Sequence, residues 1–429
     1  MSRPLRIGLL PDGFMSWGGG VDFLCTMVDC LRLAAPASEL SFVLLVRRSR
    51  RPPRRRDLIH EAWVRWGCGG PGTKLGRHAV VNLIGDASYK DFCRLTATMS
   101  EAMPLRTFRD DESLDALATA EQLDCLLPAL YPLRSDVRTP WIGYVADFQH
   151  RHLPAFFSDE ERQMRDRDMR LMAVNASHVI ANSRHACEDC RRFLGTSHAE
   201  FVPIPFAAAA GGDWFDDESE RLKPYSLPPR YFLISNQFWM HKNHRLAFEA
   251  LVHLRKEPRM DDVGIVCTGS TSDYRDPTYF PSLCRFLEES GIMPHVSILG
   301  YVPKRDQIEI MKNSVAVIQP TLFEGGPGGG AVYDAVSLGI PSLVSDIPIN
   351  RELDGQNFPI RFFPPSSSTA LATLMRESLD GCPRAASDTV ALRRAGEKRR
   401  RAAGEVLLST IRAAIASRNV APVSPALSP

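Results

Sequence analysis

The stretch VAVIQPTLFEGGPGGGAVYDAVSLGIPSLVS, residues 315–345, contains a strand, a glycine-rich turn, a helix and a second strand. The apolar runs 315–318 and 342–345 predict two buried strands. Five of the six residues 325–330 are glycine, and a helical pattern follows at residues 332–338. Strands joined through a helix pair in parallel, so this unit predicts a doubly wound α/β fold.

The same alternation of short apolar runs and helical patterns fills the second half of the chain. Strands are expected at residues 231–235, 263–267 and 296–299, and helices at 244–255, 279–290 and 305–313. This half follows the sequence KPYSLPPR at residues 223–230, whose three prolines predict a stiff connector between domains.

The first half repeats the pattern. An apolar run at residues 6–11 leads to a glycine turn at 18–20, a helical pattern at 21–33 and a strand at 41–46. Further strands are expected at residues 79–84, 123–127, 141–145 and 178–181. The sequence therefore predicts two Rossmann-like domains that face a central cleft, where ligands of such sheets bind.

Four segments follow from this division. We expect an N-terminal Rossmann-like domain at residues 1–222 and a C-terminal one at 223–395. A helix at residues 396–418 is expected to pack back on the N-terminal domain. The Pro- and Ser-rich residues 419–429 are expected to be disordered.

Composition narrows the class of protein. The 429 residues are 44% hydrophobic and 24% charged, which excludes a fully disordered chain. The net charge of +2 gives no argument for nucleic-acid binding. No apolar run reaches the roughly 20 residues of a transmembrane helix. We expect a cytoplasmic protein without a nucleic-acid partner.

Two local features remain open to more than one interpretation. Cys187 and Cys190 have the spacing of a metal or redox pair, but no second pair accompanies them, so a coincidence on a helix is favoured and no metal ligand is assigned. The basic residues 47–56 are interpreted first as a solvated loop. The alternative is a contact with an anionic acceptor or with lipid headgroups, which would place the protein peripherally at the inner membrane face.

The glycine-rich turn is the strongest candidate binding site. Successive glycines expose several backbone N–H groups at a helix N-terminus, a geometry that favours a phosphate or diphosphate. Glu324 precedes the turn, and Asp334 lies one turn into the following helix, within reach of a ribose hydroxyl. A flexible surface loop is the alternative, but so many glycines weaken a fold through chain entropy, which argues against a loop kept for packing.

Two further polar stretches follow predicted strands. SNQFWMHKNH at residues 235–244 contains Lys242, a point charge suited to a diphosphate, whereas Asn243 could simply cap the helix. GYVADFQHRHLP at residues 143–154 contains Asp147, Gln149, His150 and His152. The second stretch is interpreted as a sugar or acceptor site, with a plain surface loop as the alternative.

The order of these motifs resembles that of family 4 retaining glycosyltransferases of GT-B fold. The similarity rests on residues 235–244, on LFEG at 322–325 followed by LGIPSLVSD at 338–346, and on DFQH at 147–150 with LPAFFS at 153–158. The last pair is typical of a bacterial branch that builds surface polysaccharides. The resemblance runs from the glycine turn at residues 18–20 to the strand at 342–345.

This resemblance implies a hexosyltransferase that moves a sugar from a nucleotide-diphosphate donor to a glycan or lipid-linked acceptor, with retained configuration. It implies no cofactor and no required metal. The N-terminal domain would bind the acceptor and the C-terminal domain the donor. The residues implied to be catalytic are Glu324, Lys242 and His150, and those implied to bind the acceptor are Asp147, Gln149 and His150. The donor would lie against Gly19, Asn236, Lys242, Glu324, Gly325, Gly328, Gly329, Gly330 and Asp334.

The roles implied by the family are specific. Glu324 matches the first acid of a glutamate pair and would contact the donor sugar, whereas Asp334 stands at the second acid with a longer spacing. Lys242 and the amides of residues 328–330 would stabilise the leaving diphosphate. The family's usual arginine is replaced by Asn236, and Ala146 replaces its first-domain histidine, for which His150 is the substitute.

Two other functions fit the same residues. The first is a nucleotide-sugar epimerase on the same scaffold, which would need no acceptor. The second is a non-catalytic homologue that binds a nucleotide or glycan, for which the missing arginine is the main support. A nicotinamide-dependent oxidoreductase is disfavoured because residues 18–20 do not form GxGxxG.

Overall fold

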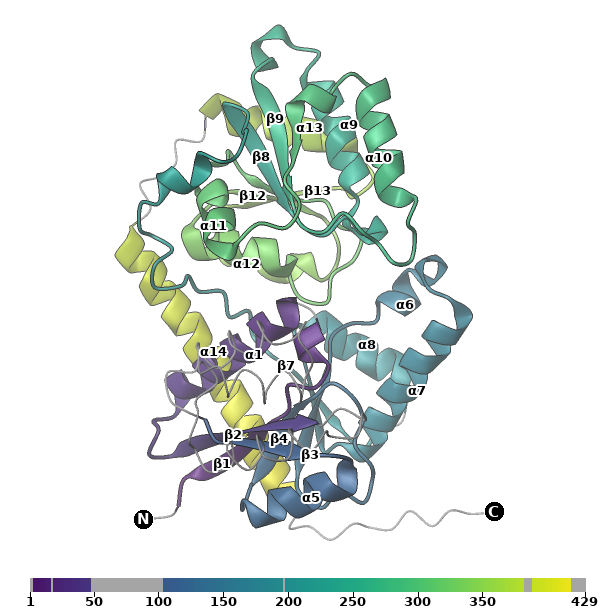
Figure 1. Ribbon diagram of the computed structural model, residues 1–429, viewed down its shortest axis with the longest axis vertical. Helices are drawn as coiled ribbons and strands as arrows, with labels where there is room; N and C mark the ends of the chain where they lie inside the picture. The colour runs from purple at the N-terminus through teal and green to yellow at the C-terminus, as the bar shows by residue number, and fades with distance from the viewer. Residues whose placement is uncertain (1–2, 17, 48–102, 196, 382–387, 418–429) are drawn as a thin grey trace, which may run out of the picture.

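The computed structural model describes residues 3–16, 18–47, 103–195, 197–381 and 388–417. They form two α/β units stacked along the long axis of the molecule (Figure 1). The expected strand at residues 79–84, all of the basic segment except Arg47, and the tail at 419–429 lie outside the described residues.

The N-terminal unit is a parallel sheet of seven described strands in the order β3-β2-β1-β4-β5-β6-β7. Strands β4, β5 and β6 are buried along their whole length because helices cover both faces of the sheet. The strands are β1 (Leu5–Leu9), β2 (Leu40–Arg47), β3 (Leu105–Phe108), β4 (Cys125–Ala129), β5 (Trp141–Val145), β6 (His178–Ala181) and β7 (Glu200–Pro203). The helices are α1 (Gly18–Ala34), α5 (Asp111–Ala120), α6 (Gln149–His152), α7 (Asp159–Asn175) and α8 (Arg184–Leu194).

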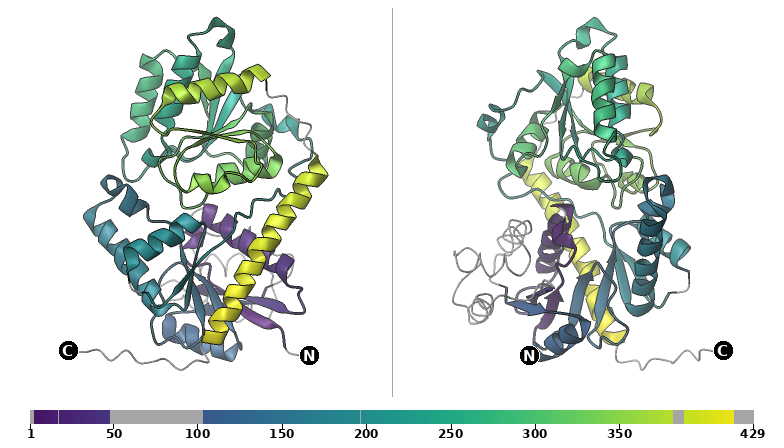
Figure 2. Two further views of the ribbon diagram at one scale, coloured as in Figure 1. Left: turned by 180° about the vertical axis from the view of Figure 1, so that it is seen from behind. Right: turned by 45° about the vertical axis from the view of Figure 1, so that its right-hand side comes forward.

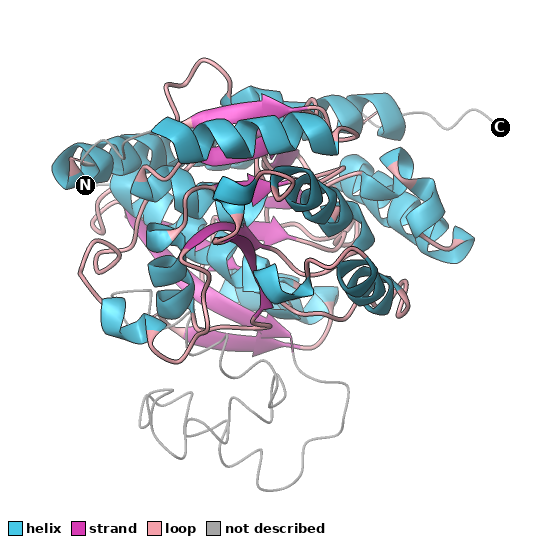
Figure 3. Ribbon diagram, turned by 90° about the horizontal axis from the view of Figure 1, so that it is seen from above, coloured by secondary structure: helices cyan, strands magenta, loops and turns pink. Residues whose placement is uncertain are grey.

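The C-terminal unit repeats this topology with six described parallel strands in the order β10-β9-β8-β11-β12-β13. Helices again lie on both sides of the strands, as the view from above shows (Figure 3). The strands are β8 (Arg230–Ser235), β9 (Val263–Thr268), β10 (Val296–Ile298), β11 (Val317–Gln319), β12 (Ser342–Ser345) and β13 (Ile360–Phe363). The helices are α9 (His244–Leu254), α10 (Tyr279–Glu289), α11 (Lys304–Asn313), α12 (Gly329–Leu338) and α13 (Ser368–Gly381).

The predicted fold class is confirmed: both units are Rossmann-like and parallel. The expected strands at residues 141–145, 178–181 and 342–345 coincide with β5, β6 and β12. Three strands were not expected, namely β3, β7 and β13, and each lies at an edge of its sheet. These three strands are only partly buried, so they lack the continuous apolar run that identifies an inner strand.

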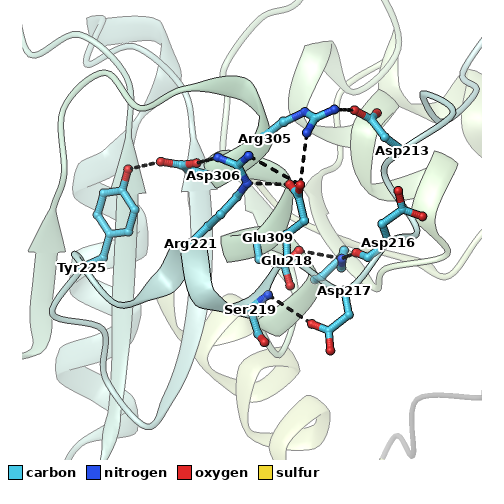
Figure 4. A network of polar contacts seen from close by, with 11 residues as sticks. Asp213, Asp216, Asp217, Glu218, Ser219, Arg221, Tyr225, Arg305, Asp306 and Glu309 are labelled. Atoms are coloured by element: carbon cyan, nitrogen blue, oxygen red, sulfur yellow. Dashed lines mark hydrogen bonds and ion pairs between the residues drawn. The ribbon is translucent and has the colours of Figure 1, made fainter.

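The connector between the two sheets is held to the C-terminal unit before β8 begins. Arg221 donates to Asp306 of α11 at 3.1 Å, and the hydroxyl of Tyr225 donates to the same carboxylate at 2.6 Å. Arg305 reaches back to Glu218 at 3.1 Å (Figure 4). This contact begins ahead of the domain boundary expected at residues 222 and 223, so the connector and α11 form one packed layer.

The long helix α14 (Thr389–Ser417) follows the C-terminal unit but lies along α1 of the N-terminal unit (Figure 2). Leu407 and Ile411 are buried in the core that α1 forms with the N-terminal sheet. Arg400 pairs with Asp29 of α1 at 2.9 Å. Helix α14 therefore connects the two units and lies outside both sheets.

None of the described helices is both long enough and apolar enough to cross a membrane.

Candidate active site

The two strongest motifs meet at the centre of the C-terminal sheet. The chain leaves β8 toward β9 on one side, whereas β11 lies on the other side of β8. In open parallel sheets, ligands bind beyond the carboxyl ends of the strands at this change of direction. The segment with Lys242 follows β8, and the segment with Glu324 follows β11.

A continuous chain of polar side chains joins these two segments. Asn236 donates to Gln319 Oε1 at 2.7 Å, and Gln319 Nε2 donates to Glu324 Oε1 at 2.7 Å. Lys242 Nζ donates to the same carboxylate oxygen at 2.5 Å. Glu324 is only 8% exposed and Lys242 only 9%. The structure thus brings together three predicted residues, and it adds Gln319 as the amide that orients Glu324.

The Lys242–Glu324 pair explains how a cation can lie at the start of α9. A positive charge there opposes the helix dipole, and the carboxylate of Glu324 compensates for it. Burial, together with the neighbouring charge of Lys242, lowers the pKa of His244 to about 3. Burial likewise depresses the pKa of His241, helped by Lys242 and Arg275. Both imidazoles are therefore neutral near pH 7.

The glycine turn lies against the N-terminal unit. A Cβ atom at Gly325 would come within 2.6 Å of the Ala146 carbonyl oxygen and 3.2 Å of Asp147 Cβ. A Cβ atom at Gly326 would lie 3.2 Å from Asn182. The missing side chains allow this loop to touch the carboxyl ends of β5 and β6. The predicted donor loop and the predicted acceptor residue Asp147 are thus direct neighbours.

The backbone amides of the turn are partly engaged. The N–H of Gly328 donates to Asn350 Oδ1 at 2.8 Å, and the N–H of Gly329 donates to the Gly326 carbonyl at 3.1 Å. Gly328 and Gly329 have φ of 72° and 63°, a left-handed conformation that favours glycine. Among residues 328–330, the N–H of Gly330 is the only one without a hydrogen-bond acceptor in the described part of the chain. Anion binding by all three amides would need the loop to rearrange.

Asp334 lies one turn into α12, as expected, and is only 8% exposed. Its carboxylate is paired with Lys304 at the start of α11. Lys304 also lies 5.2 Å from the ring centre of Trp214, in the connector. The predicted ribose contact of Asp334 would therefore compete with Lys304.

Asp147 and Gln149 follow β5 and are joined by a hydrogen bond. Asp147 Oδ1 accepts the backbone N–H of Gln149 at 2.9 Å. The side-chain oxygen of Gln149 accepts a hydrogen bond from Arg275 of the C-terminal unit at 3.1 Å. These two predicted acceptor residues thus lie where the two units touch.

His150 does not join them. Its side chain has no exposed surface, and its Nε2 donates to Asp166 of α7 at 3.0 Å. Burial lowers its pKa, although Asp166 opposes the shift. The helical turn of α6 directs this ring into the N-terminal unit between Phe148 and Phe157. The predicted roles of His150 in catalysis and acceptor binding therefore have no geometric support in this conformation.

Gly19 lies in the first turn of α1 and is exposed. Because α1 follows β1, it begins at the same carboxyl edge of the sheet as Asp147. This is the edge that meets the glycine turn. Its predicted contact with the donor phosphates stays a prediction.

Two residues at the interface were given no role of their own in the sequence analysis. The His152 ring lies 5.2 Å from Phe323, next to Glu324. Arg275 is nearly buried and contacts Gln149, Asp273 and His241. The polar stretch that follows β5 contains His152, so that signal was present. Arg275 stands alone in a polar loop, and no spacing in the sequence distinguishes it.

The pair Cys187 and Cys190 is buried on the inner face of α8. Burial raises the pKa of Cys187 to about 12 and also raises that of Cys190. Both groups are therefore protonated thiols near pH 7 that pack as small apolar side chains. This agrees with the favoured interpretation of their spacing as a coincidence.

The family comparison supports the C-terminal half of this site. Residues 217–390 match the family model described as Glycosyl transferases group 1. The match covers the connector, the C-terminal sheet and the start of α14. No curated protein matches the chain by sequence.

Solved structures resemble the whole chain at low sequence identity. HepE from Anabaena, crystallised with UDP, superposes with a TM-score of 0.59 at 14% identity, covering 95% of this chain and all of that one. Sucrose-phosphate synthase from Thermosynechococcus elongatus gives 0.58 at 13% identity, covering 96% of this chain and all of that one. The lipopolysaccharide outer core galactosyltransferase WaaB gives 0.55 at 12% identity, covering 95% and 100%.

These findings establish the fold. The fold is that of the GT-B glycosyltransferases, with two Rossmann-like units in contact. The similarity to the group 1 glycosyltransferase family model is confined to residues 217–390, less than half of the chain.

Proposed function

We propose that the protein is a retaining, family 4 type glycosyltransferase of a surface-polysaccharide pathway. It moves a hexose from a nucleotide-diphosphate sugar to a glycan or lipid-linked acceptor. The observation that carries this proposal is the buried contact of Lys242 with Glu324 beyond β8 and β11, together with the position of Gly325, the residue after Glu324, against Asp147 of the other unit. A group 1 domain and the GT-B fold support the same class of reaction.

In this proposal Lys242 exchanges its partner when the donor binds. Its ammonium group is neutralised by Glu324 in the absence of donor. A diphosphate carries more negative charge than one carboxylate, so it would draw Lys242 and stabilise the charge that develops on the leaving group. Glu324 stays oriented by Gln319 and would face the donor sugar. Transfer on one face then depends on positioning and charge stabilisation, with no cofactor and no required metal.

Asp147 and Gln149 would contact the acceptor from the opposite side of the interface. The ends of β5 and of the glycine turn are adjacent, so acceptor and donor sugar would meet there. A lipid-linked acceptor would bring the protein peripherally to the inner face of a membrane.

The first experiment is a thermal-shift screen of UDP- and GDP-sugars in the presence of EDTA. At a donor concentration of 100 times Kd, the free energy of unfolding should rise by about 2.7 kcal/mol. The Lys242→Ala variant should lose this shift, whereas Lys256→Ala, an exposed lysine of the same unit, should keep it. No shift with any of these donors would contradict the proposal.

The second experiment separates the possible activities. The best donor is incubated with and without candidate acceptors, and the products are followed by NMR. A glycosylated product with the donor's anomeric configuration supports the proposal. An epimerised donor formed without acceptor would identify an epimerase instead, and turnover unchanged in Glu324→Ala would remove Glu324 from the mechanism.

A further inference from the structure

Three potential metal ligands gather on the N-terminal unit next to the donor loop. They are His152 at the end of α6 and His185 and Asp189 on α8, and their ligand atoms all lie within 4.8 Å of one another. His152 Nε2 donates to Asp189 Oδ2 at 2.6 Å, and His185 Nε2 lies 3.9 Å from the same oxygen. Two imidazoles and one carboxylate form a donor set that suits first-row divalent transition metals.

The charge of the cluster is unbalanced. Asp189 is only 3% exposed, and a buried carboxylate needs a cation or several hydrogen bonds. Among the described residues, Asp189 forms ion pairs with His152 and His185, and neither imidazole is a permanent cation. A divalent ion would supply the missing positive charge.

The scaffold holds the three groups in place. His185 and Asp189 are four residues apart on α8, so their side chains share one face of the helix. Ser183 caps this helix by accepting the N–H of Ala186 at 2.9 Å. Glu352 of the C-terminal unit accepts the N–H of His185 at 2.8 Å. The first turn of α8 is therefore fixed by contacts from both units, as a preorganised site requires.

The third ligand is fixed by aromatic contacts. The His152 ring packs edge-on against Phe193 at 5.7 Å and lies 5.2 Å from Phe323. Metal–ligand distances of about 2.0–2.2 Å need ligand atoms within roughly 4.4 Å of one another. The cluster already approaches this separation, so small rotations of the two histidine side chains would complete it.

We propose that His152, His185 and Asp189 bind one divalent transition-metal ion, with zinc as the representative ion. With three protein ligands, one position stays open for water. The ion would join α6 to α8 and fix the His152 ring against Phe323, beside Glu324. Its role is to position this side of the interface, and the proposal does not depend on the identity of the donor or on the transfer reaction.

The test uses the full-length protein stripped with EDTA and titrated with zinc chloride by calorimetry, with bound zinc counted by elemental analysis after desalting. Wild type should retain one zinc ion per chain. His185→Gln and Asp189→Asn should each bind zinc at least about tenfold more weakly. His198→Gln, an exposed histidine of the same unit, should bind as wild type does.

Cobalt gives an independent readout of the same site. Cobalt-loaded wild type should show visible d–d absorption, and His152→Gln should reduce it. Circular dichroism of the metal-free variants verifies their folding. If Asp189→Asn unfolds, His185→Gln decides the outcome, because the His185 side chain is partly exposed. Two results would overturn the proposal: equal zinc binding by wild type and His185→Gln, or no stoichiometric zinc in wild type. In either case the cluster would be only a hydrogen-bonded His–Asp pair.

Discussion

At the scale of single residues, the candidate site depends on one carboxylate that serves two donors. Glu324 Oε1 accepts from both Lys242 and Gln319, and Asn236 extends the chain to the end of β8. An ion pair this deeply buried contributes little net stability, because desolvation offsets the attraction between the charges. Removing one partner is costly, since the other charge is then left buried and unpaired.

We therefore expect Glu324→Gln to lower the free energy of unfolding by about 3 kcal/mol. Urea denaturation of the metal- and ligand-free protein measures this change. The double variant Lys242→Met/Glu324→Gln removes both charges and should recover most of the loss. A single variant as stable as wild type would show that the pair is solvated.

The interface between the units leaves no room for a side chain at Gly325. Gly325→Ala would push a methyl group to within 2.6 Å of the Ala146 carbonyl oxygen. We expect a loss of about 1–3 kcal/mol and a larger radius of gyration in small-angle scattering, because the loop must move away from the N-terminal unit.

Gly330→Ala is the matched control for this variant. A Cβ atom at Gly330 meets nothing within 4 Å, so stability should change by less than about 0.5 kcal/mol. Equal effects of the two substitutions would mean that chain entropy in the turn, rather than contact between the units, selects glycine here.

At the scale of elements, the segment between β8 and α9 combines buried histidines with a lysine. The His244 ring stacks on Phe238 with 4.1 Å between ring centres. Its folded-state pKa of about 3 lies far below the ordinary value of 6.5. The unfolded chain therefore binds more protons than the folded one between these two pH values, so stability falls as the pH drops through this window.

We expect His244→Phe to weaken this pH dependence by about 1.4 kcal/mol per pH unit between pH 6 and pH 4. Urea denaturation across this range measures the slope for both proteins. His253→Gln, on the same helix but only partly buried, should keep the wild-type slope. Identical slopes in wild type and His244→Phe would contradict the assignment of a neutral His244.

At the scale of the whole molecule, the two units are held together by contacts far from one another in sequence. Glu352 of the C-terminal unit accepts the N–H groups of Arg184 and His185 at the start of α8. Arg275 bridges to Gln149 at another point of the interface. Helix α14 completes the connection by packing on α1.

The contact between α14 and α1 gives a prediction at this scale. A Cβ atom at Gly404 would lie 1.9 Å from the Cys30 carbonyl oxygen, so Gly404→Ala must displace the helix. Helix propensity alone would favour alanine by about 1 kcal/mol, yet overpacking should dominate and reduce stability by about 1–3 kcal/mol. Thermal unfolding measures this change, and Ala413→Ser at an exposed position of α14 is the control. A stabilised Gly404→Ala variant would mean that α14 is detached in solution.

The sequence predicted much of the architecture because the inner strands of a parallel sheet are short, buried and mainly apolar runs. β5, β6 and β12 were located to the residue for this reason. The edge strands β3, β7 and β13 were not, because partial exposure leaves no such run. The placement of Lys242 and Glu324 beyond the ends of two strands also followed from the sequence, since each lies in the segment after a predicted strand, whereas the pairing of these strands came from the structure.

Only the tertiary structure decided which polar side chains meet. The sequence interpretation assigned catalytic and acceptor roles to His150 and no role of its own to His152, but one turn of α6 buries the first ring and presents the second to Phe323. Asp189 and Arg275 gained partners from segments distant in the chain, which no local spacing encodes. Strands and turns are determined by local periodicity and backbone freedom, whereas the direction of a side chain depends on what packs against it.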